Sequence, residues 1–262
     1  MNMLRTKKSY EFPTEEALKK YLQEHPKADK SLHHVKKHDV SHNPKFTPSK
    51  LPRTDIESKK ADLMENGSHD KWRSKLTNTE KFLLQEYTGL GYTSVNSMLR
   101  DKPDWDMNVR DVEALRDEAN TLDNALRKYE TPKPVLVHRG QTLTEDLKPL
   151  IDKILSGELE AKDVVISDRG FTSTSLDPQI STLFMKGEVG VLFNITLPKG
   201  THGGLLANSD ISENADENEF LLASGSSFRL TKVQKKYGGD YNEYFYGNDF
   251  YSINCELVSQ KK

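Results

Sequence analysis

The stretch Glu217-Asn218-Glu219-Phe220-Leu221-Leu222 places two acids two positions apart at the start of an apolar run. In an extended chain, residues i and i+2 point to the same face. We therefore expect Glu217 and Glu219 to share one side of a strand start, with Phe220 and Leu222 turned toward a core. Neighbouring carboxylates repel each other, so such a pair is typical of a working site or of a solvated surface strand. The pair alone leaves both interpretations open.

Along the whole chain, from the N-terminus to the C-terminus, helical periodicity comes first and strand patterns follow. Apolar residues recur at spacings of three and four from residue 55 onward, most clearly over 108–129 and 143–156. Short strands are expected at 134–140, 164–166, 170–174, 189–197, 220–223, 227–233 and 250–258. A short helix is expected to start at Asp177-Pro178. Segregated helices and strands predict an α+β fold with a mainly antiparallel β core.

The two ends of the 262-residue chain differ in charge. Residues 1–50 hold 11 Lys or Arg and 6 Asp or Glu, whereas the formal charge of the whole chain is −2. We expect residues 1–60 to be a basic N-terminal extension and linker, and residues 61–262 to be one catalytic domain. The overall charge is not that of a nucleic-acid-binding protein, so no nucleic-acid partner is expected for the catalytic domain.

Compartment signals are sparse. Cys255 is the single cysteine, so no intramolecular disulfide can form, which fits a reducing compartment. The first eight residues have no apolar core of signal-peptide length, and no stretch approaches the roughly 18 apolar residues of a membrane span. We expect neither a signal peptide nor a transmembrane segment.

Five of the eight histidines lie in the first 50 residues. The spacing of His33, His34, His38 and His42 is compatible with three of them on one helix face. No cysteine or close acid pair completes a metal site, and Pro44 limits any helix. We expect a basic, solvated tail and no metal.

Three sets of polar residues, each expected in or beside a strand, are the candidates for a catalytic site. Arg139 ends an apolar strand, Ser173-Thr174-Ser175 follows Phe171, and Glu217 with Glu219 opens a later strand. Taken singly, each has an ordinary interpretation, as a salt-bridge partner, a helix cap or a strand surface.

Taken together, they resemble the arginine–serine–glutamate (R-S-E) class of mono-ADP-ribosyltransferases, in particular the binary-toxin and C3-like exoenzyme group. Residues 137–140 (VHRG) resemble the strand with that family's arginine, 170–175 (GFTSTS) its Ser-Thr-Ser strand, and 217–222 (ENEFLL) its E-x-E strand. Residues 87–100 are similar to the family's "YT…Y…IN…LR" helix. The resemblance covers about residues 70–258 and implies a helical N-terminal lobe packed on a two-sheet β core.

The resemblance implies a role for each matching residue, with NAD as substrate. Arg139 is expected to hold the phosphate side of NAD, assisted by Arg100, because a planar guanidinium suits phosphate. Glu219 is expected to stabilise the oxocarbenium-like ribose and to bind a ribose hydroxyl. Ser173 orients that glutamate, and Glu217 engages the acceptor. An acid rather than a glutamine at position 217 implies arginine as the modified residue.

Further positions match more loosely. Tyr87 and Asn96 correspond to family positions around the adenosine and phosphates, and Thr174 braces the strands. Gly140 follows Arg139 in the cofactor-binding stretch, where many relatives have a second arginine. Phe184 is either an aromatic on the nicotinamide side or a core residue of a 177–185 helix. The loop at 208–216 lacks the aromatic with which several relatives touch their target, which argues against an actin-like target.

We therefore expect an NAD-dependent enzyme that transfers ADP-ribose to an arginine of a target protein and releases nicotinamide. An NAD glycohydrolase, with water as acceptor, and an inactive NAD-binding module are the alternatives. The expected protein is a monomeric toxin or effector. It would reach a target cell's cytoplasm through a secretion machine or packaged with a phage, with its basic extension serving in targeting or docking.

Overall fold

The computed structural model describes residues 9–12, 33–35, 55–101, 112–185, 189–236 and 249–261. Helices dominate residues 56–127, and further helices lie between the later strands. They are α2 (Ile56–Leu63), α3 (Ser68–Ser74), α4 (Asn78–Glu86), α5 (Tyr92–Leu99), α6 (Val112–Arg127), α7 (Leu147–Ser156) and α8 (Pro178–Thr182), with a π-helical turn η3 (Tyr87–Gly91) and short 3-10 turns η2 (Glu65–Gly67), η5 (Ala161–Asp163) and η6 (Ala215–Glu217). Among the described residues, the first half thus supplies a helical lobe, as expected.

The strands form a sheet in the order β2-β1-β4-β9-β10-β6-β3-β5-β8-β7. Their bounds are β1 (Ser9–Phe12), β2 (His33–Val35), β3 (Val135–Thr142), β4 (Val165–Asp168), β5 (Thr172–Ser175), β6 (Gly190–Leu197), β7 (Gly203–Leu205), β8 (Glu219–Leu222), β9 (Ser226–Lys236) and β10 (Phe250–Gln260). The β1/β2 and β6/β10 pairs are parallel, and the other pairs are antiparallel. The α+β class with a mainly antiparallel core is confirmed.

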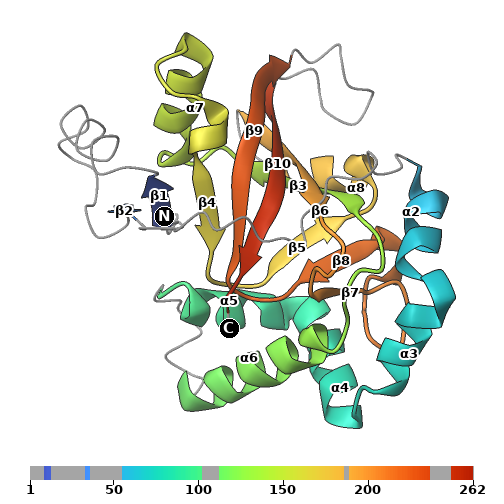
Figure 1. The fold of residues 1–262 in the computed structure, drawn as a ribbon. Coiled ribbons are helices and arrows are strands. Elements are labelled where there is room, and N and C mark those ends of the chain that lie inside the picture. Colours follow the sequence, from blue (N-terminus) through green and yellow to red (C-terminus); the bar gives the residue numbers. More distant parts are fainter. Residues whose placement is uncertain are drawn as a thin grey trace.

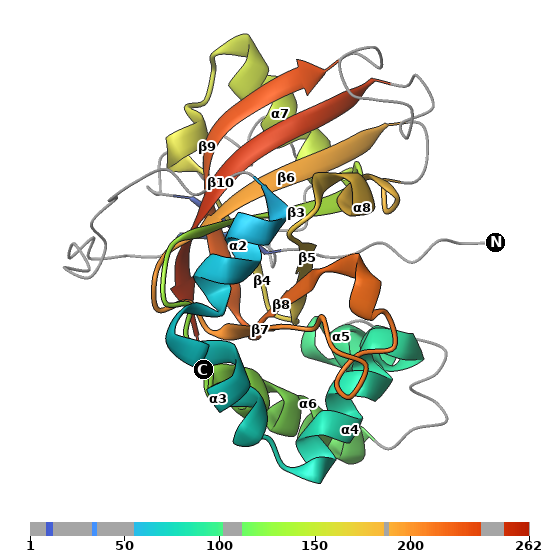
Figure 2. The same cartoon turned by 90° about the vertical axis from the view of Figure 1, so that its right-hand side faces the viewer.

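The sheet has a narrow junction. One pair of Cα partners, His138 and Ser175, joins β3 to β5, whereas β3 and β6 share eight. In Figures 1 and 2, β6, β9 and β10 lie above β7 and β8, and helices α3 to α6 cover the lower part. The strands thus form one continuous sheet, and the two sheets that the resemblance implied correspond to two parts joined at this junction.

Aromatic side chains pack the helical lobe against β7 and β8. Trp72 is almost fully buried, its ring lies 5.8 Å from that of Tyr129, and Tyr129 packs edge-on against Phe220 of β8. Gly204 permits this approach, because a Cβ there would lie 2.5 Å from the Trp72 ring. The glycine pair at 203–204 lies in strand β7, which the sequence pattern did not predict.

Two expectations about the N-terminal region can be compared with the structure. His33–Val35 is a strand, so the helix face proposed for the histidines is wrong at His33 and His34; His38 and His42 lie outside the described residues. The predicted boundary after residue 60 falls inside α2, and β1 pairs with β4 of the main sheet. The division into extension and catalytic domain stays a prediction.

No helix in the described ranges combines the length and the apolar character that crossing a bilayer requires.

Candidate functional site

Arg139, Ser173 and Glu219 meet where the two parts of the sheet join. β3 supplies Arg139, whose Nη1 donates to the Ser173 carbonyl oxygen at 2.7 Å. β5 pairs with β8 so that Ser175 faces Glu219 and Ser173 faces Leu221, which puts the Ser173 hydroxyl and the Glu219 carboxylate on one face. The two side chains hydrogen-bond. Three segments far apart in sequence thus present one guanidinium, one hydroxyl and one carboxylate together.

Glu219 is a buried carboxylate, 7% exposed. Burial raises its pKa to about 7, and the nearby Glu217 charge adds to the rise, while the Ser173 hydrogen bond and Arg139 oppose it. All four residues of β8 are buried, which excludes the interpretation of Glu219 as part of a solvated surface strand. A carboxylate held in this way is suited to stabilise positive charge that develops next to it.

Glu217 does not continue the strand backward from Glu219. It ends the 3-10 turn η6, and Asn218 adopts a left-handed conformation (φ 51°) before β8 begins at Glu219. The expected extended start with two acids on one side is therefore wrong. Glu217 is half-buried, and burial together with Asp216 raises its pKa. The turn separates the two acids, so each has its own surroundings.

Arg100 lies at the end of α5, beside the site but already paired. Its Nε and Nη2 each donate to one oxygen of Asp168 at 2.8 Å, and Nη2 also reaches the Phe171 carbonyl oxygen at 3.2 Å. Its ion pair fixes the loop that leads into β5. Its predicted assistance at the NAD phosphates stays a prediction. Arg139 is half-buried, and burial lowers its pKa.

The side chains of Tyr87 and Asn96 are buried and do not form an open surface. The Asn96 amide donates to the Tyr87 hydroxyl at 2.8 Å, and its carbonyl oxygen accepts from the Phe171 amide at 2.9 Å. The Tyr87 ring packs edge-on against Phe171, with centroids 5.5 Å apart. Both side chains therefore position the start of β5; their predicted contact with the adenosine and phosphates is untested.

Thr174 and Gly140 serve packing in the structure. The Thr174 hydroxyl donates to the Phe220 carbonyl oxygen and ties β5 to β8. A Cβ at Gly140 would lie 1.8 Å from the Ser181 carbonyl oxygen of α8, so only glycine allows that helix so close to Arg139. A direct contact of either residue with NAD stays a prediction.

Phe184 lies just beyond α8 and is 50% exposed. The alternative that it is a core residue of a 177–185 helix is therefore wrong, because α8 ends at Thr182. An exposed ring beside the helix that Gly140 packs against is free to meet a ligand. The nicotinamide-side interpretation remains a prediction.

The sequence pattern did not predict a buried position for Lys59. Its Nζ donates to the Leu176 carbonyl oxygen at 2.8 Å and lies 3.1 Å from His138 Nε2, while His138 Nδ1 faces Asn194 Oδ1 at 2.9 Å. Burial lowers the pKa of Lys59 to about 8 and that of His138 to about 4. This buried ammonium bridges β3 and β5 at their narrow junction. Its sequence context, Glu57-Ser58-Lys59-Lys60, is that of a solvated helix face.

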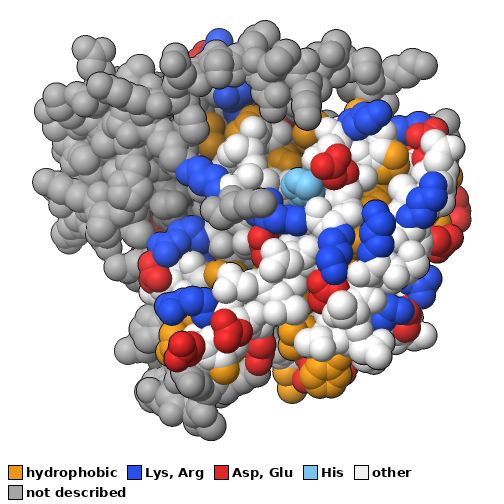
Figure 3. Space-filling view, turned by 60° about the horizontal axis from the view of Figure 1, so that its bottom comes forward, with side chains coloured by type: hydrophobic (Ala, Val, Ile, Leu, Met, Phe, Trp, Pro, Cys, Tyr) orange, Lys and Arg blue, Asp and Glu red, His pale blue; other side chains and the backbone are white. Residues whose placement is uncertain are grey.

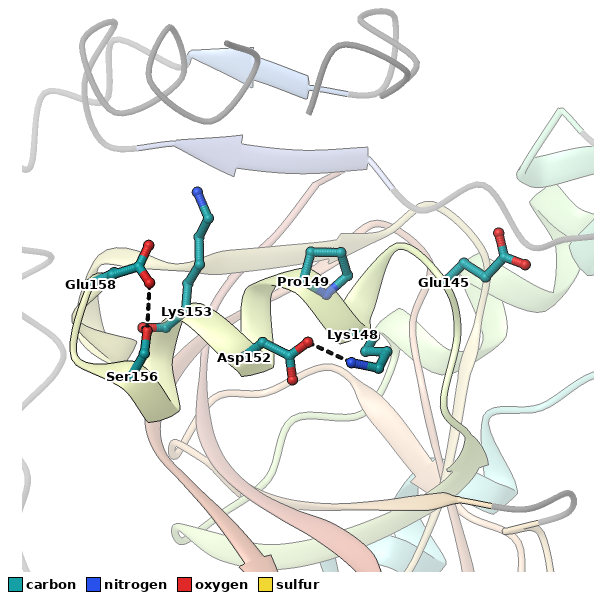
Figure 4. Close-up of a pocket in the computed structure, with 7 residues that line it drawn as sticks. All are labelled: Glu145, Lys148, Pro149, Asp152, Lys153, Ser156 and Glu158. Atoms are coloured by element: carbon teal, nitrogen blue, oxygen red, sulfur yellow. Dashed lines mark hydrogen bonds and ion pairs between the residues drawn. The ribbon is translucent and has the colours of Figure 1, made fainter. Parts of the chain in front are cut away.

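A surface hollow of about 490 Å³ lies elsewhere (Figure 4). It is lined along α7 by Glu145, Lys148, Pro149, Asp152, Lys153, Ser156 and Glu158. Lys148 pairs with Asp152, and Ser156 donates to Glu158. None of the predicted site residues lines it. The constellation on β3, β5 and β8 is therefore the better candidate.

No cluster of three or more His, Cys, Asp or Glu side chains suited to a metal occurs within the described ranges.

Comparisons with known proteins agree with the geometry. The family model described as ADP-ribosyltransferase exoenzyme matches residues 64–246. The NAD(+)–arginine ADP-ribosyltransferase EFV of Enterococcus faecalis is 26% identical over 157 residues, covering 58% of this chain and 28% of that protein. The putative NAD(+)–arginine ADP-ribosyltransferase Vis of Vibrio splendidus is 28% identical over 174 residues, 63% of each chain. The chain thus spans less than two thirds of either relative.

Among solved structures, Plx2a, an ADP-ribosyltransferase toxin from Paenibacillus larvae, has a TM-score of 0.60 and 24% identity, covering 79% of this chain and 98% of that one. This likeness establishes the fold. The family model covers well over half of the chain and includes Arg139, Ser173 and Glu219. The chain therefore belongs to the ADP-ribosyltransferase exoenzyme family.

Proposed function

We propose that the protein transfers ADP-ribose from NAD to an arginine side chain of a target protein and releases nicotinamide. The observation that carries the proposal is the buried Glu219 carboxylate, hydrogen-bonded to Ser173 and next to Arg139. Family membership and two relatives named as arginine-specific transferases support it.

Each group has a separate task in the proposed reaction. Arg139 binds the pyrophosphate of NAD by charge-assisted hydrogen bonds. As the bond between nicotinamide and ribose breaks, nicotinamide leaves with the bonding electrons and the ribose becomes cationic. Ionised Glu219 stabilises that cation. Ser173 keeps its carboxylate oriented.

Glu217 serves the acceptor. It lies outside the strand on its own turn, so its carboxylate is available to a second molecule. An arginine guanidinium there donates to Glu217, its nitrogen attacks the ribose C1, and Glu217 accepts the proton released. The rise in the pKa of Glu217 makes its carboxylate a better proton acceptor.

The partner proposed is a protein, and the enzyme is proposed to act as a monomer. On the face shown in Figure 3, Lys and Arg side chains alternate with Asp and Glu over the described residues. Mixed charge of this kind suits a protein surface better than a nucleic acid.

Residues 1–60 are proposed to serve targeting or docking, with delivery into a target cell's cytoplasm by secretion machinery or with a phage. Their basic first 50 residues support this. A truncated protein should start at residue 55, since α2 carries Lys59. Retained NAD cleavage with loss of delivery of a fused reporter is expected; retained delivery would contradict the proposal.

Label transfer tests the activity. The protein is incubated with NAD labelled on its adenylate part and an arginine-rich acceptor protein, beside Glu219→Ala. Label on the acceptor only with the unmodified protein is the expected result. Equal transfer by Glu219→Ala would refute the role of that carboxylate.

A further inference from the structure

The π-helical turn η3 contacts both sides of the site. On one side, Tyr87 reaches β5 through Asn96 and the Phe171 amide, two residues before Ser173. On the other side, the next residue, Thr88, contacts the segment 208–216 that leads to Glu217. A single irregular turn therefore touches the supports of both Ser173 and Glu217. Such π-helical turns within helices are frequent at functional sites.

Thr88 is 9% exposed, and its hydrogen bonds have a defined direction. Its hydroxyl donates to the Gln85 carbonyl oxygen at 2.8 Å, which leaves an oxygen lone pair to accept from the Glu213 amide at 2.9 Å. Its own carbonyl oxygen accepts from the Asn214 side-chain amide, also at 2.9 Å. Thr88 therefore holds two successive residues of the segment.

From there the path to Glu217 is short. The Asn214 carbonyl oxygen accepts from the Glu217 amide at 3.1 Å and closes the turn that ends at Glu217. Gly89 lies close to the Glu213 side chain, because a Cβ there would lie 2.5 Å from its carboxylate. Displacement of residues 213 and 214 would therefore move Glu217 directly.

The far end of the segment has a different anchor. Asp210 pairs with Arg73 at 2.7 Å and with Lys81 at 3.2 Å, but its side chain is 39% exposed. Ion pairs that water reaches contribute little. The contacts of Thr88 are part-buried, so water reaches them less than the exposed pairs of Asp210, and they lie nearer to Glu217.

We propose that Thr88 is a positioning residue that holds Glu217 in place for the arginine acceptor. This inference rests on the proposed function and deepens it: Thr88 governs transfer to arginine, while cleavage of NAD depends on Glu219, Ser173 and Arg139. In this role Thr88 acts through Glu213 and Asn214.

The test compares Thr88→Val, which keeps the shape and loses the hydroxyl, with Thr88→Ser, which keeps the hydroxyl. Label transfer to an arginine acceptor and nicotinamide release without acceptor are both measured. For Thr88→Val, the ratio of transfer to release should fall about five- to tenfold, the scale of one hydrogen bond. Thr88→Ser should restore it. Thr121→Val is the matched control, since the Thr121 hydroxyl bonds only a carbonyl of its own helix α6.

Hydrogen exchange supplies a readout independent of activity. In Thr88→Val, amides of residues 213–217 should exchange faster, while those of β5 keep their rates. The inference is overturned if the ratio is unchanged, if transfer and release fall in parallel, or if exchange at 213–217 does not change. A complete lack of transfer by the unmodified protein would instead contradict the proposed function, and the exchange result would still decide whether Thr88 holds the segment.

Discussion

The pH dependence of NAD cleavage should report the ionisation of Glu219. Burial raises the pKa of this carboxyl from 4.5 to about 7, and only the ionised form can stabilise the ribosyl cation. Well below pH 7, kcat/KM should rise about tenfold per pH unit, and at pH 6 it should be about a tenth of its plateau. The plateau should be reached near pH 8.

Two substitutions should move this inflection in opposite directions. Glu217→Gln removes a negative charge that raises the pKa of Glu219, so the inflection should move below 7; it should stay above 4.5, because burial is the larger cause. Ser173→Ala removes a hydrogen bond that lowers the pKa, so the inflection should move above 7.

The assay is nicotinamide release at subsaturating NAD without acceptor, from pH 5 to 9 at constant ionic strength. Glu158→Gln, in the hollow along α7, is the control and should leave the inflection in place. An inflection near 4.5 in the unmodified protein, or shifts of the same sign in both variants, would refute this explanation.

Three further substitutions test the supports of the site. Arg139→Lys keeps a charge but loses the planar fork, so KM for NAD should rise about tenfold or more in initial-rate measurements; an unchanged KM would contradict phosphate binding by Arg139. Gly140→Ala should destabilise the fold by about 1–3 kcal/mol or more in urea titrations, because its Cβ would meet the Ser181 carbonyl oxygen; a neutral effect would contradict the close packing of α8. Lys59 has a lowered pKa, so the folded state releases its proton at lower pH than the unfolded state, and the free energy of unfolding should rise between about pH 8 and 10.5, by up to about 3 kcal/mol. Lys59→Met should remove that rise, and an identical pH dependence in both proteins would exclude Lys59 as its source.

The parts of the site that the sequence predicts are those with short-range signals. Arg139, Ser173 and Glu219 each follow from a local strand pattern, and the structure brings them together. The order of helices and strands follows equally well from apolar periodicity.

The features of the site that the sequence did not predict depend on long-range packing or on single backbone angles. Nothing near Lys59 indicates burial, because its partners lie 79 and 117 residues away. The left-handed Asn218 breaks the alternation that predicted a strand at Glu217. No sequence pattern around Thr88 predicts its contacts with residues 213 and 214.

The central claim is transfer of ADP-ribose from NAD to protein arginine. Peptide mass spectrometry of a cell lysate treated with the protein and NAD tests it most directly. The predicted result is ADP-ribose on arginine side chains, absent when Glu217→Gln is used although that variant still releases nicotinamide. Modification of other residue types, or nicotinamide release by the unmodified protein with no modified arginine, would contradict the claim.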